Sequence, residues 1–174
     1  MVIARTTHLF LRQLRVTDGE AMNGIFGDSE VMRFSDGTKT LGQVRQWVNQ
    51  WVDDLYHRWG FGMWALVRQC DDLTIGYCGL SRFPDRVAPS ETEIGFRLAR
   101  PFWGRGFATE AVVAARDYAF ATLKIPKLVA LIDPANVASI RVVEKAGFGL
   151  ERDAMLAGYD HPDRIYSMTR PTGG

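Results

Sequence analysis

The chain has 174 residues, of which 47% are hydrophobic and 24% charged, as in a globular protein that can bury a core. Its 21 basic and 20 acidic residues give a formal charge of +1, which offers no general attraction to nucleic acid or to an anionic membrane. No stretch approaches the roughly 20 apolar residues of a membrane span. The N-terminal segment does not resemble a signal peptide, and two cysteines are too few for a disulfide framework. We therefore expect one domain, residues 1–174, in the reduced cytoplasm.

The first half of the chain is predicted to alternate strands with two helices. Leu9–Leu14 is expected to form a strand, and Thr17 and Glu20 have the spacing of a capping box that would begin a helix. Thr40 and Gln43 repeat that spacing. Apolar residues then follow with helical periodicity at Val44, Trp47, Val48, Trp51 and Leu55. Two further strands, Phe61–Val67 and Leu73–Leu80, are separated by a polar link that indicates a hairpin.

The second half is predicted to run strand, helix, strand, helix and then two closing strands. The expected elements are Thr92–Ala99, Ala108–Leu123, Leu128–Ile132, Asn136–Ala146, Phe148–Ala154 and Ile165–Thr169. Gly147 is a natural C-terminal cap for the second of these helices. The order of elements along the chain indicates one mixed α/β domain.

The segment between the Thr92–Ala99 strand and the following helix carries the strongest chemical signal. Gly104 and Gly106 allow a sharp backbone turn, and the N–H groups at the following helix start form a natural anion site. Arg105 adds positive charge, so a pyrophosphate is the expected guest. No Walker motif is present, and Thr109 stands where a dinucleotide fingerprint has Gly or Ala. A tight turn without any ligand is the alternative reading.

Four motifs together resemble the GNAT superfamily of N-acetyltransferases, and within it the branch of the ribosomal-protein N-terminal acetyltransferases. They are Leu9–Arg12 with Arg15 and Asp18; Val31–Phe34; Glu93–Phe96 with Trp103–Ala111; and Asn136, Ser139, Glu144, Lys145, Gly147 and Phe148. The resemblance covers nearly the whole chain. It implies a central, mostly antiparallel sheet in which two parallel strands splay apart, flanked by helices.

The resemblance also implies acetyl-CoA as cosubstrate and assigns residues to it. The expected coenzyme-binding residues are Ile94, Phe96, Trp103, Gly104, Arg105, Gly106, Phe107, Ala108, Thr109, Asn136, Ser139, Arg141 and Lys145. The backbone N–H near Phe96 is expected to polarise the thioester carbonyl. Two positions depart from the superfamily pattern. Trp103 replaces a common Gln or Arg, and Val143 replaces a tyrosine that protonates the departing thiolate in many relatives.

Two side chains are the candidates for proton transfer in a direct attack of the amine on the thioester. Glu93 is the expected base, acting directly or through water, with Glu91 as a weaker competitor. Strand alternation puts Glu93 and Arg97 on one face, so the structural alternative is that Glu93 pairs with Arg97 or with a neighbouring strand. Ser139 is the expected hydroxyl at the sulfur; its alternative role is to serve the backbone at a helix start.

The acceptor is expected to be a small-molecule amine or a peptide or protein N-terminus. It would contact Phe34, Trp47, Trp51 and Tyr159. No nucleic-acid or membrane partner is expected, and the protein is predicted to be a monomer or homodimer. His8 and His57 lack metal partners at suitable spacing, and Asp160–Asp163, with three possible ligands, is read as a polar turn, so no metal is expected. The rival hypotheses are a catalytically idle acyl-CoA-binding or regulatory module on the same fold, and a nucleotide-binding protein that uses the same loop.

Overall fold

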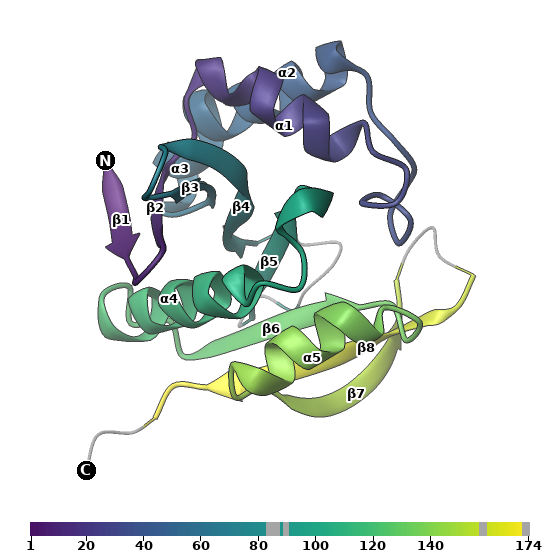
Figure 1. Ribbon diagram of the computed structural model, residues 1–174. Coiled ribbons are helices and arrows are strands. Elements are labelled where there is room, and N and C mark those ends of the chain that lie inside the picture. The colour runs from purple at the N-terminus through teal and green to yellow at the C-terminus, as the bar shows by residue number, and fades with distance from the viewer. Residues whose placement is uncertain (83–87, 89–90, 157–159, 172–174) are drawn as a thin grey trace.

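An eight-stranded sheet forms the centre of the computed structural model, which describes residues 1–82, 88, 91–156 and 160–171 (Figure 1). The strands lie in the order β1-β2-β3-β4-β5-β6-β8-β7. They are β1 (Val2–Arg5), β2 (Leu9–Gln13), β3 (Met63–Arg68), β4 (Leu73–Ser81), β5 (Thr92–Leu98), β6 (Lys127–Ile132), β7 (Gly149–Met155) and β8 (Pro162–Thr169). Every neighbouring pair is antiparallel except β5 and β6. The predicted mixed α/β fold is therefore confirmed.

Helices cover both faces of the sheet. They are α1 (Gly19–Phe26), α2 (Leu41–Gln50), α3 (Tyr56–Trp59), α4 (Phe107–Ala121) and α5 (Val137–Lys145), with short η1 (Val16–Asp18), η2 (Trp51–Leu55) and η3 (Arg100–Phe102). Figure 1 shows α1 and α2 together on one side of the first strands and α4 between the two halves of the sheet. In the part of the chain that the structure describes, no helix is long and apolar enough to cross a membrane.

The parallel strands β5 and β6 part soon after they begin. Their backbones pair only at Thr92 with Leu128 and at Glu93 with Val129. Beyond these pairs the two strands diverge, which opens the sheet toward their C-terminal ends. The predicted splay of two parallel strands is confirmed, and α4 connects them.

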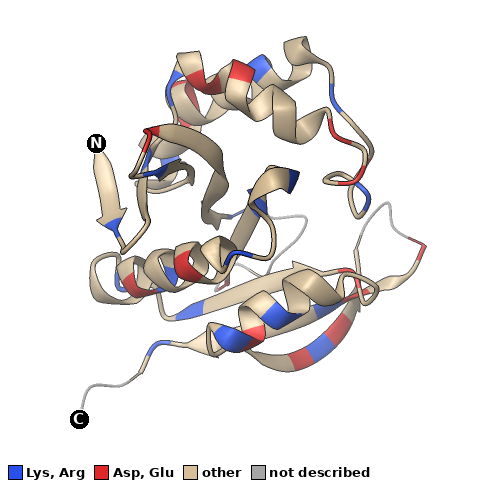
Figure 2. Cartoon of the chain, in the orientation of Figure 1, with Lys and Arg blue, Asp and Glu red and all other residues tan. Residues whose placement is uncertain are grey.

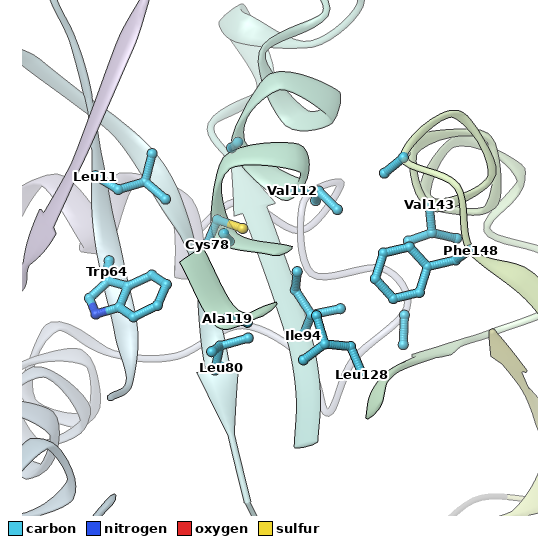
Figure 3. Packing of buried hydrophobic residues seen from close by; sticks show 14 of the residues in the cluster. Leu11, Trp64, Cys78, Leu80, Ile94, Val112, Ala119, Leu128, Val143 and Phe148 are labelled. Atoms are coloured by element: carbon cyan, nitrogen blue, oxygen red, sulfur yellow. The ribbon is translucent and has the colours of Figure 1, made fainter. Parts of the chain in front are cut away.

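Two large hydrophobic clusters stabilise the two faces of the sheet, Tyr56 and Trp59 pack against both, and a small third cluster contains Val129 and Ile165. Alternation along β3 sends Trp64 and Leu66 into the cluster beneath α4, and sends Ala65 and Val67 into the cluster beneath α1 and α2. The first cluster continues through β5 and β6 to α5, where Val143 packs near Phe148 (Figure 3). The second is rich in aromatic rings from α1, α2 and β4.

The predicted α2 helix begins as its sequence indicates. The Thr40 hydroxyl accepts from the Gln43 N–H at 3.4 Å, and the Gln43 side chain accepts from the Thr40 N–H at 2.8 Å, which completes a capping box. The helical path continues past α2 through the wider π-helical turn η2, so Trp51 and Leu55 still face the core.

The predicted capping box of Thr17 and Glu20 is wrong. Helix α1 begins after Asp18, whose carboxylate accepts the Arg15 N–H at 2.7 Å and two hydrogen bonds from the Arg12 guanidinium. A buried ion pair between β2 and the helix start therefore sets this turn. Strand β1 was not predicted, because its four residues are recognisable only by their pairing with β2.

A cluster of charged side chains links β5, β6 and β7 at the closed end of the splay. Lys127 lies 3.0 Å from Glu91 and 2.8 Å from Glu151, and Arg152 lies 3.1 Å from Glu91. Burial raises the pKa of Glu91, but hydrogen bonds from Lys127, the Ala88 N–H and Arg152 outweigh it and lower the pKa. Hydrogen bonds from Lys127 and Ser167 lower the pKa of Glu151 to about 2. Both carboxylates are therefore stabilised in their charged form.

This cluster predicts a specific loss of stability in acid. A carboxyl whose folded-state pKa is depressed contributes stability above its unfolded pKa of about 4.3, and that stability is lost as the pH falls through the folded value. We expect the melting temperature to fall as the pH falls from about 5 toward 2. Lys127→Met should lower the melting temperature at neutral pH and flatten this acid dependence, whereas Lys124→Met, at an exposed lysine, should do neither. Thermal denaturation of both variants across that pH range checks these expectations. If the melting temperature of Lys127→Met depends on pH as that of the unmodified protein does, the charged cluster is not the cause of the acid dependence.

Candidate active site

A cleft of about 760 Å³ lies where β5 and β6 diverge. It collects residues from the α1–α2 connection, α2, β5, the start of α4, the end of β6 and α5. The predicted site residues that line it are Phe34, Trp47, Trp51, Glu93, Ile94, Phe96, Trp103, Gly104, Gly106, Phe107, Ala108, Thr109, Asn136, Ser139, Arg141 and Lys145. Arg105 does not line it, and Tyr159 lies outside the described residues. The structure thus brings nearly all of the predicted residues to one place.

The loop before α4 has the backbone of an anion site. Gly104 and Gly106 have φ angles of +71° and +82°, which only glycine adopts without strain. A Cβ at either position would meet no atom within 4 Å, so the space beside both residues is open. No side chain caps α4, and the Glu110 N–H donates to the Gly106 carbonyl at 3.0 Å. The N–H groups before Glu110 at this helix start are therefore available to a ligand.

The position of this loop is fixed by contacts on either side of it. The Trp103 indole N–H donates to the Leu98 carbonyl at 2.8 Å, which ties the loop to the end of β5. Glu110 accepts the His8 N–H at 2.7 Å and contacts the His8 ring at 2.9 Å, which ties α4 to the N-terminal strands. The Arg105 guanidinium carbon lies 6.0 Å from the ring centroid of Phe102, which lines the cleft, although Arg105 itself does not.

The first turn of α5 borders the cleft opposite α4. The Asn136 side chain accepts the Ser139 N–H at 3.1 Å and caps the helix, which leaves the Ser139 hydroxyl out of that bond. Arg141 and Lys145 are four residues apart and therefore share a helical face, and both line the cleft. Figure 2 shows basic segments along α5 together with an acidic one. Positive charge is thus presented along one edge of the cleft.

Val143, at the position where many relatives carry a tyrosine, is fully buried. Its exposed fraction is 0%, it belongs to the core cluster of α4, and it does not line the cleft. The α5 residues that line the cleft are Val137, Ala138, Ser139, Arg141, Val142 and Lys145. Of these, only Ser139 carries a hydroxyl.

Two glutamates near the closed end of the splay have different surroundings. Glu91 is held by Lys127 and Arg152, so its carboxylate is committed to ion pairs between strands. Glu93 lines the cleft, is 7% exposed and accepts the Ser81 hydroxyl at 3.5 Å. The alternative pairing of Glu93 with Arg97 does not occur, because Arg97 donates to Ser35 and to the Met32 sulfur instead.

Another part of the cleft is bordered by α2 and by the connection between α1 and α2. Trp47 lines it between Phe26, at a centroid distance of 5.0 Å, and Tyr77, at 5.1 Å. Trp51 is 1% exposed and supports this wall from within the core. Sequence reasoning missed Tyr77, Met63 and Ser81, which come from β3 and β4. Strand alternation assigns faces to these residues, but only the register shows which of them face the cleft.

In the described part of the chain, no group of three or more His, Cys, Asp or Glu residues is placed to hold a metal ion. His161 lies 3.4 Å from Asp133, and both positions sit beyond the ends of β6 and β8. Asp133 and Asp163 contribute acidic groups to that end of the cleft.

Comparison with known proteins gives a consistent result. The acetyltransferase (GNAT) domain family matches residues 8–149. The uncharacterized protein YkkB of Bacillus subtilis is 37% identical over 163 residues, covering 92% of each chain. Spermidine N(1)-acetyltransferase of Escherichia coli K12 is 37% identical over 147 residues, covering 83% of this chain and 75% of its own. A solved acetyltransferase from Agrobacterium tumefaciens is 30% identical with a TM-score of 0.80, covering 97% of this chain and 94% of its own. With the splayed strands and the glycine loop described above, these matches show that the chain belongs to the GNAT family of acetyl-CoA-dependent acetyltransferases.

Proposed function

We propose that this acetyltransferase moves the acetyl group of acetyl-CoA to a primary amine by direct attack, with both substrates bound at once. One observation carries the proposal. The coenzyme loop and the aromatic acceptor wall line the same cleft, and Glu93 lies in it at the point where β5 and β6 separate. Two substrates bound in one cleft can meet without an enzyme-bound acetyl intermediate.

The glycine loop and α5 are the proposed coenzyme site. The diphosphate would accept hydrogen bonds from backbone N–H groups between Gly104 and Thr109, at the positive end of α4. Arg141 and Lys145 would meet the ribose phosphate from α5. The pantetheine arm would lie along Ile94 and Phe96, where β5 has lost its partner strand. There the Phe96 N–H is proposed to polarise the thioester carbonyl.

Glu93 is the proposed base. An amine that is protonated in solution must lose a proton before it attacks, and a buried carboxylate in the cleft is suited to accept it directly or through water. The neighbouring Glu91 is unsuited, because its two cationic partners stabilise the carboxylate and weaken it as a base. The attack forms the amide bond and breaks the C–S bond, and the released thiolate takes up a proton.

Ser139 is proposed to lie beside the sulfur or the adjacent arm of the coenzyme. A serine hydroxyl is a weak acid, so it would solvate the developing thiolate or relay a proton from water. A thiol titrates near pH 8.5, so the thiolate is already a tolerable leaving group at neutral pH. The role of Ser139 is therefore expected to be supportive.

The acceptor is proposed to present its amine from the α1–α2 side, against Phe34 and Trp47. The similarity to a spermidine acetyltransferase supports a small amine, and the sequence resemblance supports a peptide N-terminus. The cytoplasmic location and the monomeric or homodimeric state stay predictions from the sequence.

The loop proposal predicts that Gly106→Val weakens coenzyme binding. The valine side chain would project into the open space beside the loop, where phosphate oxygens are expected. The matched control is Gly60→Val. Gly60 has a φ of +73° and equally open surroundings, but does not line the cleft. Both variants should lose similar stability, about 1–3 kcal/mol of backbone strain. Calorimetry should show weaker CoA binding for Gly106→Val alone, and equal affinity in two folded variants would disprove the loop assignment.

The base proposal predicts that Glu93→Gln lowers kcat by about 10²–10⁴, with little change in acetyl-CoA affinity. Glu91→Gln is the matched control two residues away. It should keep its rate and instead lose a few degrees of melting temperature, since about 1 kcal/mol corresponds to about 2–4 °C at this size. Steady-state kinetics and thermal melts of the two variants check this. A normal rate for Glu93→Gln at every pH would return Glu93 to a structural role.

The Ser139 proposal predicts that Ser139→Ala lowers kcat about 10-fold, equivalent to about 1.4 kcal/mol of transition-state stabilisation. Helix α5 should stay intact, because the cap uses the Ser139 N–H and not its hydroxyl. Acetyl-CoA affinity and melting temperature should therefore match the unmodified protein. Full activity of Ser139→Ala would mean that water alone protonates the thiolate.

A further inference from the structure

Arg97 lines the proposed acceptor half of the cleft and has no acidic partner among the residues that the structure describes. It lies on β5, four residues beyond Glu93 and on the same face, so the two Cα atoms are about 13 Å apart along the strand. Both residues line the cleft. Arg97 is half-buried and pairs in register with Tyr77 on β4.

The guanidinium of Arg97 is held in place by neutral groups. One terminal nitrogen donates to the Ser35 hydroxyl at 2.5 Å, and the other donates to the Met32 sulfur at 2.9 Å. Its central carbon lies 5.8 Å from the Phe26 ring centroid. Among the described residues no carboxylate lies within salt-bridge distance of Arg97. A guanidinium has five N–H donors, so it can still donate to another acceptor.

The half-buried arginines of the described chain fall into two groups. Arg12, Arg68 and Arg116 lie 2.7, 2.5 and 2.7 Å from the carboxylates of Asp18, Asp71 and Asp117. Among the described residues, Arg164 and Arg170 have no carboxylate within salt-bridge distance, like Arg97, but neither of them lines the cleft. Arg97 is the half-buried arginine that borders the cleft, and its counter-charge is not supplied by the described chain. A partly desolvated cation in this position favours an anion from the ligand.

The path from Glu93 to Arg97 is apolar. Gly95 lies between them on the same face, and a Cβ there would come within 3.0 Å of the Met63 methyl group. Trp47 and Tyr77 form the wall beside this path, with ring centroids 5.1 Å apart. A ligand bound along it would thus meet a carboxylate at one end, apolar groups in the middle and a cation at the other end.

We propose that the acceptor is an amine that also carries a carboxylate, with an apolar segment between the two groups. The amine would lie at Glu93 and the carboxylate would accept hydrogen bonds from Arg97. This inference rests on the proposed function and narrows its substrate class. It disfavours polyamines, whose second cation would face the Arg97 guanidinium.

The acidic groups at the rim of the cleft do not alter this choice. Glu30 has a side chain that is 54% exposed and lies 3.9 Å from Arg33, and Asp36 is also exposed. Charges in contact with water are screened by salt, whereas the half-buried Arg97 is screened less. The rim therefore contributes little to the choice between an anionic and a cationic group deeper in the cleft.

The test compares amines that differ only in the distal group. Linear ω-aminoalkanoates of increasing length are assayed beside their carboxamides and spermidine, by thiol release from acetyl-CoA. At the best chain length, the unmodified protein should show a kcat/KM at least about 10-fold higher for the carboxylate than for the carboxamide. The reason is that a hydrogen bond from a guanidinium to a carboxylate is stronger than one to a neutral amide. No preference for the carboxylate, or a preference for spermidine, would overturn the inference and leave the proposed function standing.

Variants then assign the preference to Arg97. Arg97→Gln should bring the carboxylate-to-carboxamide ratio to within about 2-fold, and Arg97→Lys should keep part of it, with acetyl-CoA affinity unchanged in both. Arg45→Gln makes the same change in net charge at an exposed arginine paired with Glu20, and should keep the full ratio. If folded Arg97→Gln keeps the full carboxylate-to-carboxamide ratio, Arg97 does not recognise the carboxylate, and its role is limited to holding the loop that contains Ser35.

A binding measurement separates failure of the inference from failure of the proposed function. Calorimetry with the protein saturated in CoA should show tighter binding of the aminoalkanoate than of its carboxamide, and Arg97→Gln should abolish the difference. If no amine is acetylated, the proposed function fails, and this binding difference alone decides whether Arg97 recognises a carboxylate. Equal binding of both probes would overturn the inference.

Discussion

The parting of β5 and β6 is the constraint on which the rest of the structure depends. A sheet is stabilised by unbroken rows of backbone hydrogen bonds, and here the row stops after two residue pairs. The strands remain apart because each is packed against helices on one face. Val143 of α5 and the following Phe148 lie in the same hydrophobic cluster as α4 and both halves of the sheet. The opened strand edges leave backbone groups that face a cleft, which is where a substrate can replace the missing strand.

The order of elements around this opening could be predicted from the sequence, because its signals are local. Turn glycines, a capping asparagine and the apolar periodicity of α4 and α5 lie within a few residues of the structure that they determine. Long-range pairings could not be predicted in the same way. Glu91 is held by Lys127 and Arg152, which are 36 and 61 residues away. No local pattern marks such partners.

The same distinction divides the candidate site. The proposed coenzyme half comes from two stretches of chain, 94–109 and 136–145, that carry recognisable motifs, and most of the residues predicted there line the cleft. The proposed acceptor half is assembled from the α1–α2 connection, α2 and three strands. Its aromatic wall was expected from Trp47, but Tyr77 and Met63 become visible only when the register of β3, β4 and β5 is known. Arg97 looked like a partner for Glu93 on the basis of alternation, and the register and the loop at Ser35 gave it other neighbours.

The division of the interior into two hydrophobic clusters has an evolutionary consequence. The proposed acceptor wall rests on the cluster beneath α1 and α2, whereas the proposed coenzyme loop rests on the cluster beneath α4. Substitutions that share no contacts usually have additive effects on stability. Residues such as Phe26 and Trp47 can therefore be exchanged during divergence without disturbing the groups around Phe107 and Val112. A lineage built on this scaffold can explore new acceptors while its use of acetyl-CoA is inherited unchanged.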